Sequence, residues 1–285
     1  MKGAKVLRHF FVIEIIEKAE VCMKVIKLAV VALAMVVLSP YIARAADWDI
    51  AFENKIGGTH YHEEYSTIDS KWNAFYYEGL ISANYFKEKG LVGRVDLGIP
   101  VTASAEEQWD VSSVKYQTDD MKFWGMEGNI ELGYAMPIIV DKMPFALLGG
   151  YGFNFTRFTR TNFIVLSKIT STAIVDEDYW VHHLDLGGKL VYNVSDKLKV
   201  DLKSMFGFVV YNSAHNSVLG DVNGDGGYTI RTETNVNYKY SENLALSLGG
   251  FFTFQHLEGG TSGNLVWPDN DLYTYGGNIA VKYLF

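Results

Sequence analysis

Side-chain character alternates with a period of two residues along most of this 285-residue chain, and this feature constrains the fold most. The pattern recurs in segments of roughly 10 to 15 residues, separated by polar or glycine-rich stretches. It is clearest in the last segment, where one face carries Tyr273, Tyr275, Gly277, Ile279, Val281, Tyr283 and Phe285. Because successive side chains of a strand point to opposite faces, the pattern predicts an all-β fold built from long strands.

The length of these strands favours a membrane barrel over a soluble β-protein. Residues 124–136, 180–194, 198–210 and 228–240 repeat the alternation. Strands of soluble sandwiches usually have about 5 or 6 residues. Long strands with aromatic residues near both ends are typical of lipid-facing strands between two aromatic girdles. We therefore expect a transmembrane antiparallel up-and-down β-barrel, with a secreted sandwich or a soluble barrel as the alternative.

The connections predict the number of strands. Short turns are expected at residues 87–90, 137–144, 195–197 and 241–243, and long polar segments at residues 59–72, 102–121, 159–178, 213–227 and 258–271. Outer-membrane barrels have short periplasmic turns and longer outer loops. The alternation of long and short connections predicts ten strands with both termini in the periplasm. Eight strands result if one weak pair is misassigned, and twelve if a loop hides a hairpin.

The third long segment is unusually apolar for an outer loop. It contains the run Phe163-Ile164-Val165-Leu166, followed by Ile169 and then by Ala173-Ile174-Val175. We expect the strands to continue above the membrane here as a hairpin. The alternative is a contact surface for a partner.

The N-terminus predicts export. Lys24 and Lys27 precede an apolar run from residue 28 to residue 38, and Ala43-Arg44-Ala45 is typical of a cleavage site. The run is too short to span a bilayer, which takes roughly 20 residues, and a lipid-anchoring or buried helix is the alternative. We expect residues 23–45 to be a cleaved signal peptide, residues 1–22 to be a misassigned start or leader, and residues 46–285 to form the barrel.

Composition excludes several functions. Cys22, the one cysteine, precedes the predicted mature chain, which excludes thiol chemistry and cysteine metal sites there. Removing residues 1–45 takes away 7 of 25 basic and 3 of 33 acidic residues, which leaves a net charge of −12. A chain this acidic does not bind nucleic acid through its overall charge.

The C-terminal strand carries a specific resemblance. An apolar face that ends in Phe285, the last residue, resembles the signal by which bacterial outer-membrane proteins are recognised for barrel assembly. The resemblance implies two partners, the barrel-assembly machinery and the lipid of a Gram-negative outer membrane. Any ligand of the cell surface stays unidentified at this stage.

If the apolar face contacts lipid, the other face lines the lumen. The charged residues predicted to face inward are Glu78, Arg94, Asp96, Glu127, Glu131, Asp185, Lys189, Lys199, Asp201, Lys203, Arg231, Glu233 and Lys239. Buried charges are costly unless they are paired, and a barrel of about eight strands is just wide enough for side chains to fill it. We expect a closed interior held by ion pairs, with a narrow hydrated conduction path as the alternative.

Two segments have the residue types of metal sites. Asp221, Asn223 and Asp225 match the opening D-x-N-x-D-G of a calcium loop, in which alternate oxygens converge on the ion. The acid expected at the twelfth position is absent, because Thr232 stands there, and a glycine-rich turn is the alternative. His60 and His62 would share a face of a strand and suit a transition metal, or they are solvated loop residues. No other cofactor is predicted.

A ten-stranded barrel of this size with aromatic girdles resembles the omptin proteases. The resemblance implies an Asp pair in the second outer loop and an Asp–His pair in the fourth, acting through water. The candidates in this sequence are Asp119, Asp120, His215 and Asp221, together with Asp110 and Asp225. The omptin pair has Asp two residues before His, where this chain has Ser213, so the catalytic motif is not in place.

The sequence therefore predicts an outer-membrane barrel with a structural or surface-binding role. An omptin-like protease and a narrow channel for ions or small solutes are the two alternatives. Because loops on a rigid barrel vary without cost to the fold, we expect the function to reside in the outer segments.

Overall fold

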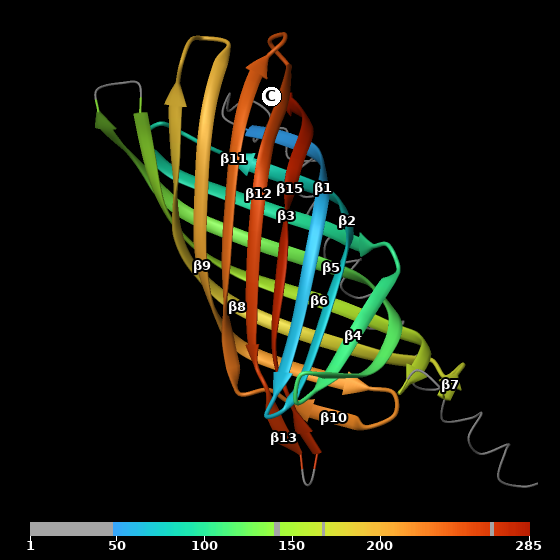
Figure 1. The fold of residues 1–285 in the computed structure, drawn as a ribbon. Helices are drawn as coiled ribbons and strands as arrows, with labels where there is room; N and C mark the ends of the chain where they lie inside the picture. Colours follow the sequence, from blue (N-terminus) through green and yellow to red (C-terminus); the bar gives the residue numbers. More distant parts are fainter. Residues whose placement is uncertain (1–47, 140–142, 167–168, 263–264) are drawn as a thin grey trace, which may run out of the picture. The chain divides into compact units, whose positions relative to one another are not determined.

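The computed structural model describes residues 48–139, 143–166, 169–262 and 265–285, which form long strands joined by turns (Figure 1). No helix in these residues is long and apolar enough to cross a membrane. The predicted leader and signal peptide lie outside the described residues. The strands are β1 (Trp48–Tyr65), β2 (Ile68–Tyr85), β3 (Gly90–Thr102), β4 (Ala105–Val111), β5 (Val114–Ile139), β6 (Met143–Val165), β7 (Ile169–Ser171), β8 (Val175–Asn193), β9 (Leu198–Asn216), β10 (Gly220–Asn223), β11 (Gly226–Lys239), β12 (Leu244–Glu258), β13 (Gly260–Ser262), β14 (Leu265–Trp267) and β15 (Asp269–Leu284).

Antiparallel pairing closes the main sheet into a ring, because β1 pairs along its length with both β2 and β15. β3 and β4 lie end to end between β2 and β5. β10 and β11 both pair with β9. Over the described residues the ring has ten positions if each interrupted strand counts once, and twelve if its parts count separately. The predicted up-and-down barrel is confirmed.

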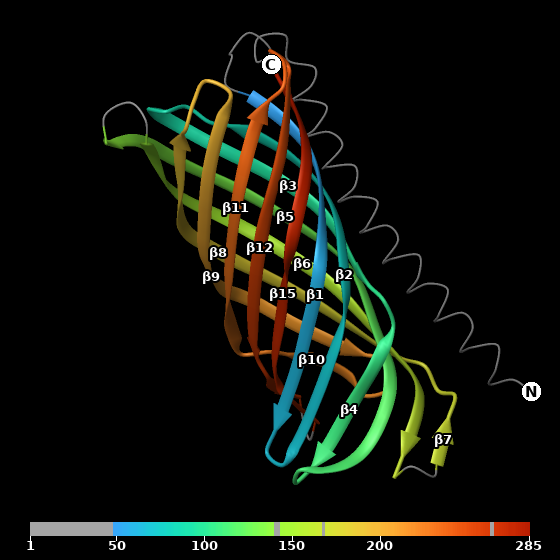
Figure 2. The ribbon, with the colours of Figure 1, turned by 45° about the horizontal axis from the view of Figure 1, so that its top comes forward.

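The two ends of the barrel differ. β1 begins and β15 ends at the short-turn end, where the connections at residues 86–89, 194–197 and 240–243 also lie (Figure 1). The opposite end is the long-hairpin end, and β4, β7, β10 and β13 all lie there (Figures 1 and 2).

The long polar segments are hairpins rather than loops, which corrects the sequence interpretation. Residues 59–72 are a paired β1–β2 hairpin with a two-residue turn at residues 66–67. The β4–β5 hairpin turns at Ser112 and Ser113, whose φ angles of 52° and 65° are those of a tight hairpin turn. In these segments the strands continue to pair although apolar and polar residues no longer alternate along them. Their polar composition therefore made them resemble loops in the sequence. The third segment follows the expected hairpin, because β6 continues to Val165 and pairs with β7.

The outer face of the ring is an apolar belt. Outward side chains such as Leu132 (68% exposed) and Leu248 (67% exposed) cover its middle. Toward the short-turn end the outward aromatic residues are Tyr134, Tyr192, Tyr238, Tyr240 and Tyr283. Toward the long-hairpin end, ring contacts join Trp124, Phe155 and Trp180, and likewise Tyr228, Phe254 and Tyr273. Two aromatic rows that bound an apolar belt are the signature of a strand that crosses a bilayer.

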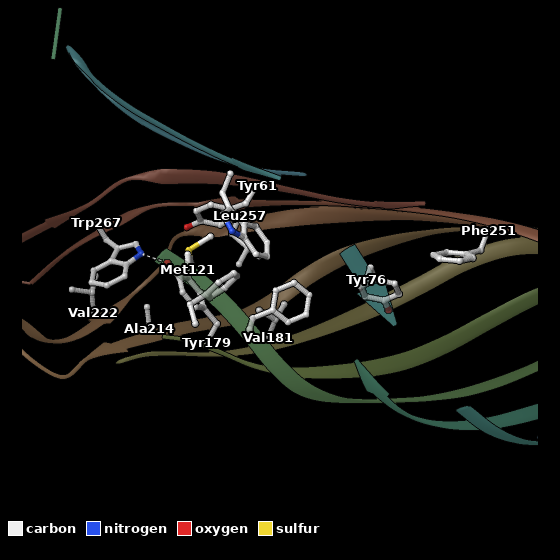
Figure 3. Close-up of a cluster of buried hydrophobic side chains, with 13 residues drawn as sticks. Tyr61, Tyr76, Met121, Tyr179, Val181, Ala214, Val222, Phe251, Leu257 and Trp267 are labelled. Carbon is white, nitrogen blue, oxygen red and sulfur yellow. Dashed lines mark hydrogen bonds between the residues drawn. The ribbon is translucent and has the colours of Figure 1, made fainter. Parts of the chain in front are cut away.

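Above the second aromatic row, the inside of the barrel contains a hydrophobic core. Its members include Tyr61, Trp72, Phe158, Tyr179 and Trp267, which are all buried (Figure 3). The indole Nε1 of Trp267 on β14 donates a hydrogen bond to the hydroxyl of Tyr179 on β8 at 2.9 Å, so β14 is joined to the wall of the barrel. The long-hairpin end is therefore packed inside like a soluble protein.

The closing seam between β1 and β15 requires glycine. Gly57 lies opposite Gly276, and a Cβ at residue 57 would lie 1.8 Å from the Tyr275 carbonyl oxygen. At Gly79, on the neighbouring β2, the nearest atom to an added Cβ is the Tyr77 hydroxyl at 3.8 Å, an ordinary contact.

We therefore expect Gly57→Ala to impair closure of the barrel and Gly79→Ala to leave it intact. The measurement is the fraction of refolded protein that shows a heat-modifiable shift on a gel, because only closed barrels resist unfolding without heating. Equal shifts for both variants would contradict the role given to Gly57.

Candidate functional site

A network of ion pairs fills the middle of the lumen. Glu233 on β11 is at its centre, with carboxylate oxygens 3.2 Å from Arg94, 3.5 Å from Lys55 and 3.6 Å from Lys203. Lys55 also pairs with Glu78 at 3.2 Å. These residues come from five strands around the ring, so the pairs cross the lumen rather than follow one wall.

A second group extends the network along β8 and β11. Arg231 pairs with Asp185 at 2.6 Å and with Glu131 at 3.7 Å, and Lys203 lies 3.1 Å from Glu131. His183 Nδ1 is 2.8 Å from Asp185. Each of these carboxylates has a cationic or hydrogen-bonding partner, which offsets the cost of placing it inside.

The structure brings most of the predicted lumen residues together. Eight belong to the ion-pair network, namely Glu78, Arg94, Asp96, Glu131, Asp185, Lys203, Arg231 and Glu233. Glu127, Lys189 and Asp201 also face inward, and Asp201 accepts hydrogen bonds from Asn235 and Asn237.

Two predicted lumen residues lie outside the ion-pair network. Lys199 and Lys239 lie on the same strand faces as Asp201 and Asn237 but are exposed near the short-turn end, and among the described residues no salt bridge joins them to the network. Lys55 and His183 were missed. The alternation of Phe52 and Ile56 with Lys55 on β1 was the signal that could have placed the lysine inside.

A small cavity separates the ion pairs from the hydrophobic core. Its volume is about 60 Å³, and Glu78, Glu127, Asn129 and Arg231 line it. Glu78 Oε1 and Asn129 Oδ1 are buried there without a hydrogen-bond partner. Because a water molecule needs a cavity of only about 10–15 Å³ by this measure, the space fits a few waters and no larger solute.

A separate charge cluster lies inside the long-hairpin end, beyond the aromatic row. Arg160 on β6 binds Glu107 on β4 through two hydrogen bonds of 2.6 Å and 3.2 Å. The same guanidinium donates to Glu177 on β8 and, at 3.3 Å, to Glu63 on β1. All four side chains are buried. One arginine therefore ties four strands together above the membrane belt.

The cluster holds more acids than Arg160 can neutralise. Asp119 lies beside Glu107 and accepts hydrogen bonds from Trp109 at 3.0 Å and from Gln117 at 3.1 Å. Burial raises the pKa of Glu63 to about 8, and burial together with the charge of Glu107 raises the pKa of Asp119 to about 8. Burial opposes ionisation of Glu107 as well, but Arg160 outweighs it and lowers the pKa of Glu107. Glu63 and Asp119 are thus mostly protonated at neutral pH, and Glu107 is ionised.

The structure does not bring the candidate catalytic residues together. Asp119 is buried inside the barrel, whereas Asp120 faces the other side of β5 and binds Asn162. His215 is outward-facing, because its neighbours Ala214 and Asn216 on β9 are the buried ones. It pairs at 2.6 Å with Asp221, whose side chain is 86% exposed. The His–Asp pair therefore lies on the opposite side of the barrel wall from Asp119.

The segment with the calcium-loop pattern is partly a strand. Asp221 and Asn223 belong to β10, which pairs with β9, and Asp225 follows it. His60 and His62 share a face of β1, where His60 binds Asn73 and His62 binds Asp69. Within the described residues, no three His, Cys, Asp or Glu side chains are grouped to hold a metal ion. The calcium site stays a prediction.

Comparison with solved structures identifies the fold. The outer membrane protease OmpT from Escherichia coli matches with a TM-score of 0.60 and 11% identity, over 85% of this chain and 98% of that one. The translocator domain of the autotransporter NalP from Neisseria meningitidis gives a TM-score of 0.42 at 12% identity, over 94% of this chain and 96% of that one. No protein family and no curated protein matches the sequence. At such identities the likeness establishes the fold alone, that of the bacterial outer-membrane β-barrels.

Two arginines three residues apart on β6 allow a matched test of the buried cluster. Arg160 is buried, whereas Arg157 faces outward, is 33% exposed and pairs with Asp178 at 2.6 Å. Replacing Arg160 by Met leaves three carboxyl groups without their cation and is expected to cost about 3–5 kcal/mol of unfolding free energy. The same change at Arg157 leaves a single carboxylate, Asp178, without its cation and should cost less, about 1–3 kcal/mol. Urea unfolding followed by tryptophan fluorescence measures both, and equal losses would refute the bridging role of Arg160.

The raised pKa values also predict a pH dependence. Between about pH 4 and about pH 8 the unfolded chain has lost the protons of Glu63 and Asp119 while the folded protein retains them, so stability falls as the pH rises through this range. We expect the urea midpoint to increase when the pH is lowered from about 8.5 to about 6. The double variant Glu63→Gln and Asp119→Asn should lose most of this increase. An unchanged pH response in the double variant would count against the assignment.

Proposed function

We propose that this chain is a non-enzymatic outer-membrane barrel with a closed lumen, which presents a binding surface at its long-hairpin end outside the cell. The observation that carries the proposal is the filling of the lumen by paired charges and packed aromatic side chains. In this arrangement the short-turn end and both ends of the barrel chain face the periplasm.

The filled lumen argues against the channel alternative. A permeating ion would have to break the pairs that Glu233 makes with Arg94, Lys55 and Lys203 and then pass the buried core around Tyr76 and Phe123. Leaving a buried charge without its partner costs about 3–5 kcal/mol. The small cavity between these layers has a volume of only about 60 Å³.

The protease alternative lacks a suitable constellation. A general base must be within hydrogen-bonding reach of the water it activates, or one water away. Asp119 is inside the barrel. The outward-facing Asp120 is bound by Asn162, and β6 and β8 separate its strand, β5, from β9, which carries His215. Similarity to a protease in fold does not carry the activity.

The closed lumen predicts that the protein does not conduct ions in a planar lipid bilayer. Insertion is verified first in liposomes by the heat-modifiable gel shift, so that a lack of current cannot be the result of failed reconstitution. Steady single-channel currents from inserted wild-type protein would overturn the proposal in favour of a channel.

A variant that opens the lumen provides the positive control. Lys203→Ala combined with Arg231→Ala removes the two cations that hold Glu131 and Asp185 in the lumen. Provided that it still shows the heat-modifiable shift, this variant is expected to give flickering, cation-selective currents, because the remaining carboxylates attract cations and water.

A further inference from the structure

The small cavity in the lumen, of about 60 Å³, is lined by hydrogen-bond acceptors that have no donor. Glu78 is fully buried and Asn129 is only 5% exposed. Glu78 Oε1 and Asn129 Oδ1 have no hydrogen-bond partner among the described residues. Glu127 also lines the cavity, and it forms no salt bridge with any described residue. Because a buried acceptor without a donor costs free energy, the described side chains alone leave this part of the lumen unsatisfied.

A glycine allows two of these carboxylates to meet. Gly98 on β3 lies opposite Glu127 on β5 and, on its other side, opposite Leu80 on β2. A Cβ at residue 98 would lie 2.2 Å from Glu78 Oε1 and 2.9 Å from Glu127 Cγ. The two glutamates therefore reach over β3 into the space that a larger residue would fill. Carboxylates this close repel each other unless a positive charge or a shared proton lies between them.

The charges around the cavity do not balance. Together with Glu127, the ion-pair network has six carboxylates and four cations among the described residues. These are Glu78, Asp96, Glu127, Glu131, Asp185 and Glu233 against Lys55, Arg94, Lys203 and Arg231. The excess is two negative charges, and a protonated His183 beside Asp185 would remove only one of them. Uncompensated charge inside a barrel is costly, so a further cation is missing from this account.

The chemistry and size of the cavity decide the class of cation. Its three unpaired acceptors are all oxygens, which hard cations such as calcium and magnesium prefer as ligands. The space holds only a few water-sized particles, at about 10–15 Å³ each, which excludes an organic cation. We propose that the cavity binds one hard divalent cation, which keeps some of its water ligands. Calcium fits best, because its coordination geometry is flexible.

The neighbouring groups leave the proposed ligand atoms free. Lys55, at 3.2 Å, and the Tyr76 hydroxyl, at 2.8 Å, both bind Glu78 Oε2, so that Oε1 remains for the ion. Glu127 supplies the second negative charge, and Asn129 supplies a neutral oxygen. Arg231 Nε is also buried without a partner, and as a donor it binds a water ligand of the ion rather than the ion itself. A proton shared by the two glutamates would leave Asn129 without a partner.

The position of the site gives it a kinetic signature. Ion pairs and the hydrophobic core fill the lumen around the cavity, so the ion is taken up as the barrel closes and is released slowly. An ion on the exposed acids of the long-hairpin end would exchange at once. The inference goes beyond the proposed surface role and relies on the proposed function only for the closed lumen that delays release.

The test refolds the urea-denatured protein into detergent with calcium chloride, with magnesium chloride or with EDTA. EDTA is then added to every sample, and retained metal is measured by mass spectrometry after gel filtration. One cavity variant is Glu127→Gln. The other is Gly98→Ala, which keeps every charge but pushes the flexible end of Glu78 aside. The matched control is Glu53→Gln, a buried carboxyl that does not line this cavity and that accepts a hydrogen bond from Asn278.

We expect wild type and Glu53→Gln to retain one calcium ion per chain and both cavity variants to retain at least about tenfold less. Retention of magnesium would support the same site. Calcium present during refolding should raise the unfolding temperature of wild type but not that of Glu127→Gln, because only the folded wild type binds it. The heat-modifiable gel shift of each variant verifies that a missing ion is not a missing fold.

Three results would overturn the inference. These are no metal retained by folded wild type, which would leave shared protons or an adventitious ion only, equal retention by wild type and both cavity variants, or a loss in Glu53→Gln as large as in Glu127→Gln. The proposed function fails separately, because steady currents in a planar bilayer decide whether the lumen is closed. Without such currents, a negative result concerns the cation site alone.

Discussion

The pairing of β1 with β15 is the constraint on which the rest of the structure depends. Inside a bilayer there is no water to satisfy a backbone amide or carbonyl, so a sheet is stable there only if it has no open edge. The sixteen paired positions from Asp49 to Glu64 remove that edge and fix the circumference of the ring. The circumference in turn fixes how much side-chain volume the lumen can hold.

The lumen and the apolar belt are stabilised by two different kinds of interaction. Outside, leucine, isoleucine and aromatic side chains match the hydrocarbon and need no particular partner. Inside, Glu233 requires three cations from three other strands. The apolar belt determines the position of the barrel in the bilayer, whereas the ion pairs specify which residues face each other across the lumen.

The fold could be predicted from sequence because its signal is local. Alternation along β15 and the short turns at residues 195–197 and 241–243 gave the closed, up-and-down barrel. The hairpins at residues 59–72 and 102–121 were mistaken for loops because their outward residues are polar once the strands leave the lipid, so the contrast between the two faces disappears.

The candidate sites could be predicted only in part, for the same reason. The sequence correctly placed the side chains of Glu131 and Asp185 inside the barrel, because both lie within alternating segments. Arg160 and its three acids were missed, since they belong to segments in which alternation is lost and their meeting depends on pairings among distant strands.

Because of the hydrophobic core around Tyr61, Tyr179 and Trp267, the two halves of the barrel are stabilised in different ways. Its lipid-embedded half relies on the bilayer as solvent and would lose its apolar contacts in water. Its long-hairpin half buries its own aromatic side chains and carries its own ion pairs, so it holds its shape where lipid ends. The rim of the barrel is thus a stiff platform, and a ligand that reaches it meets a surface already in place.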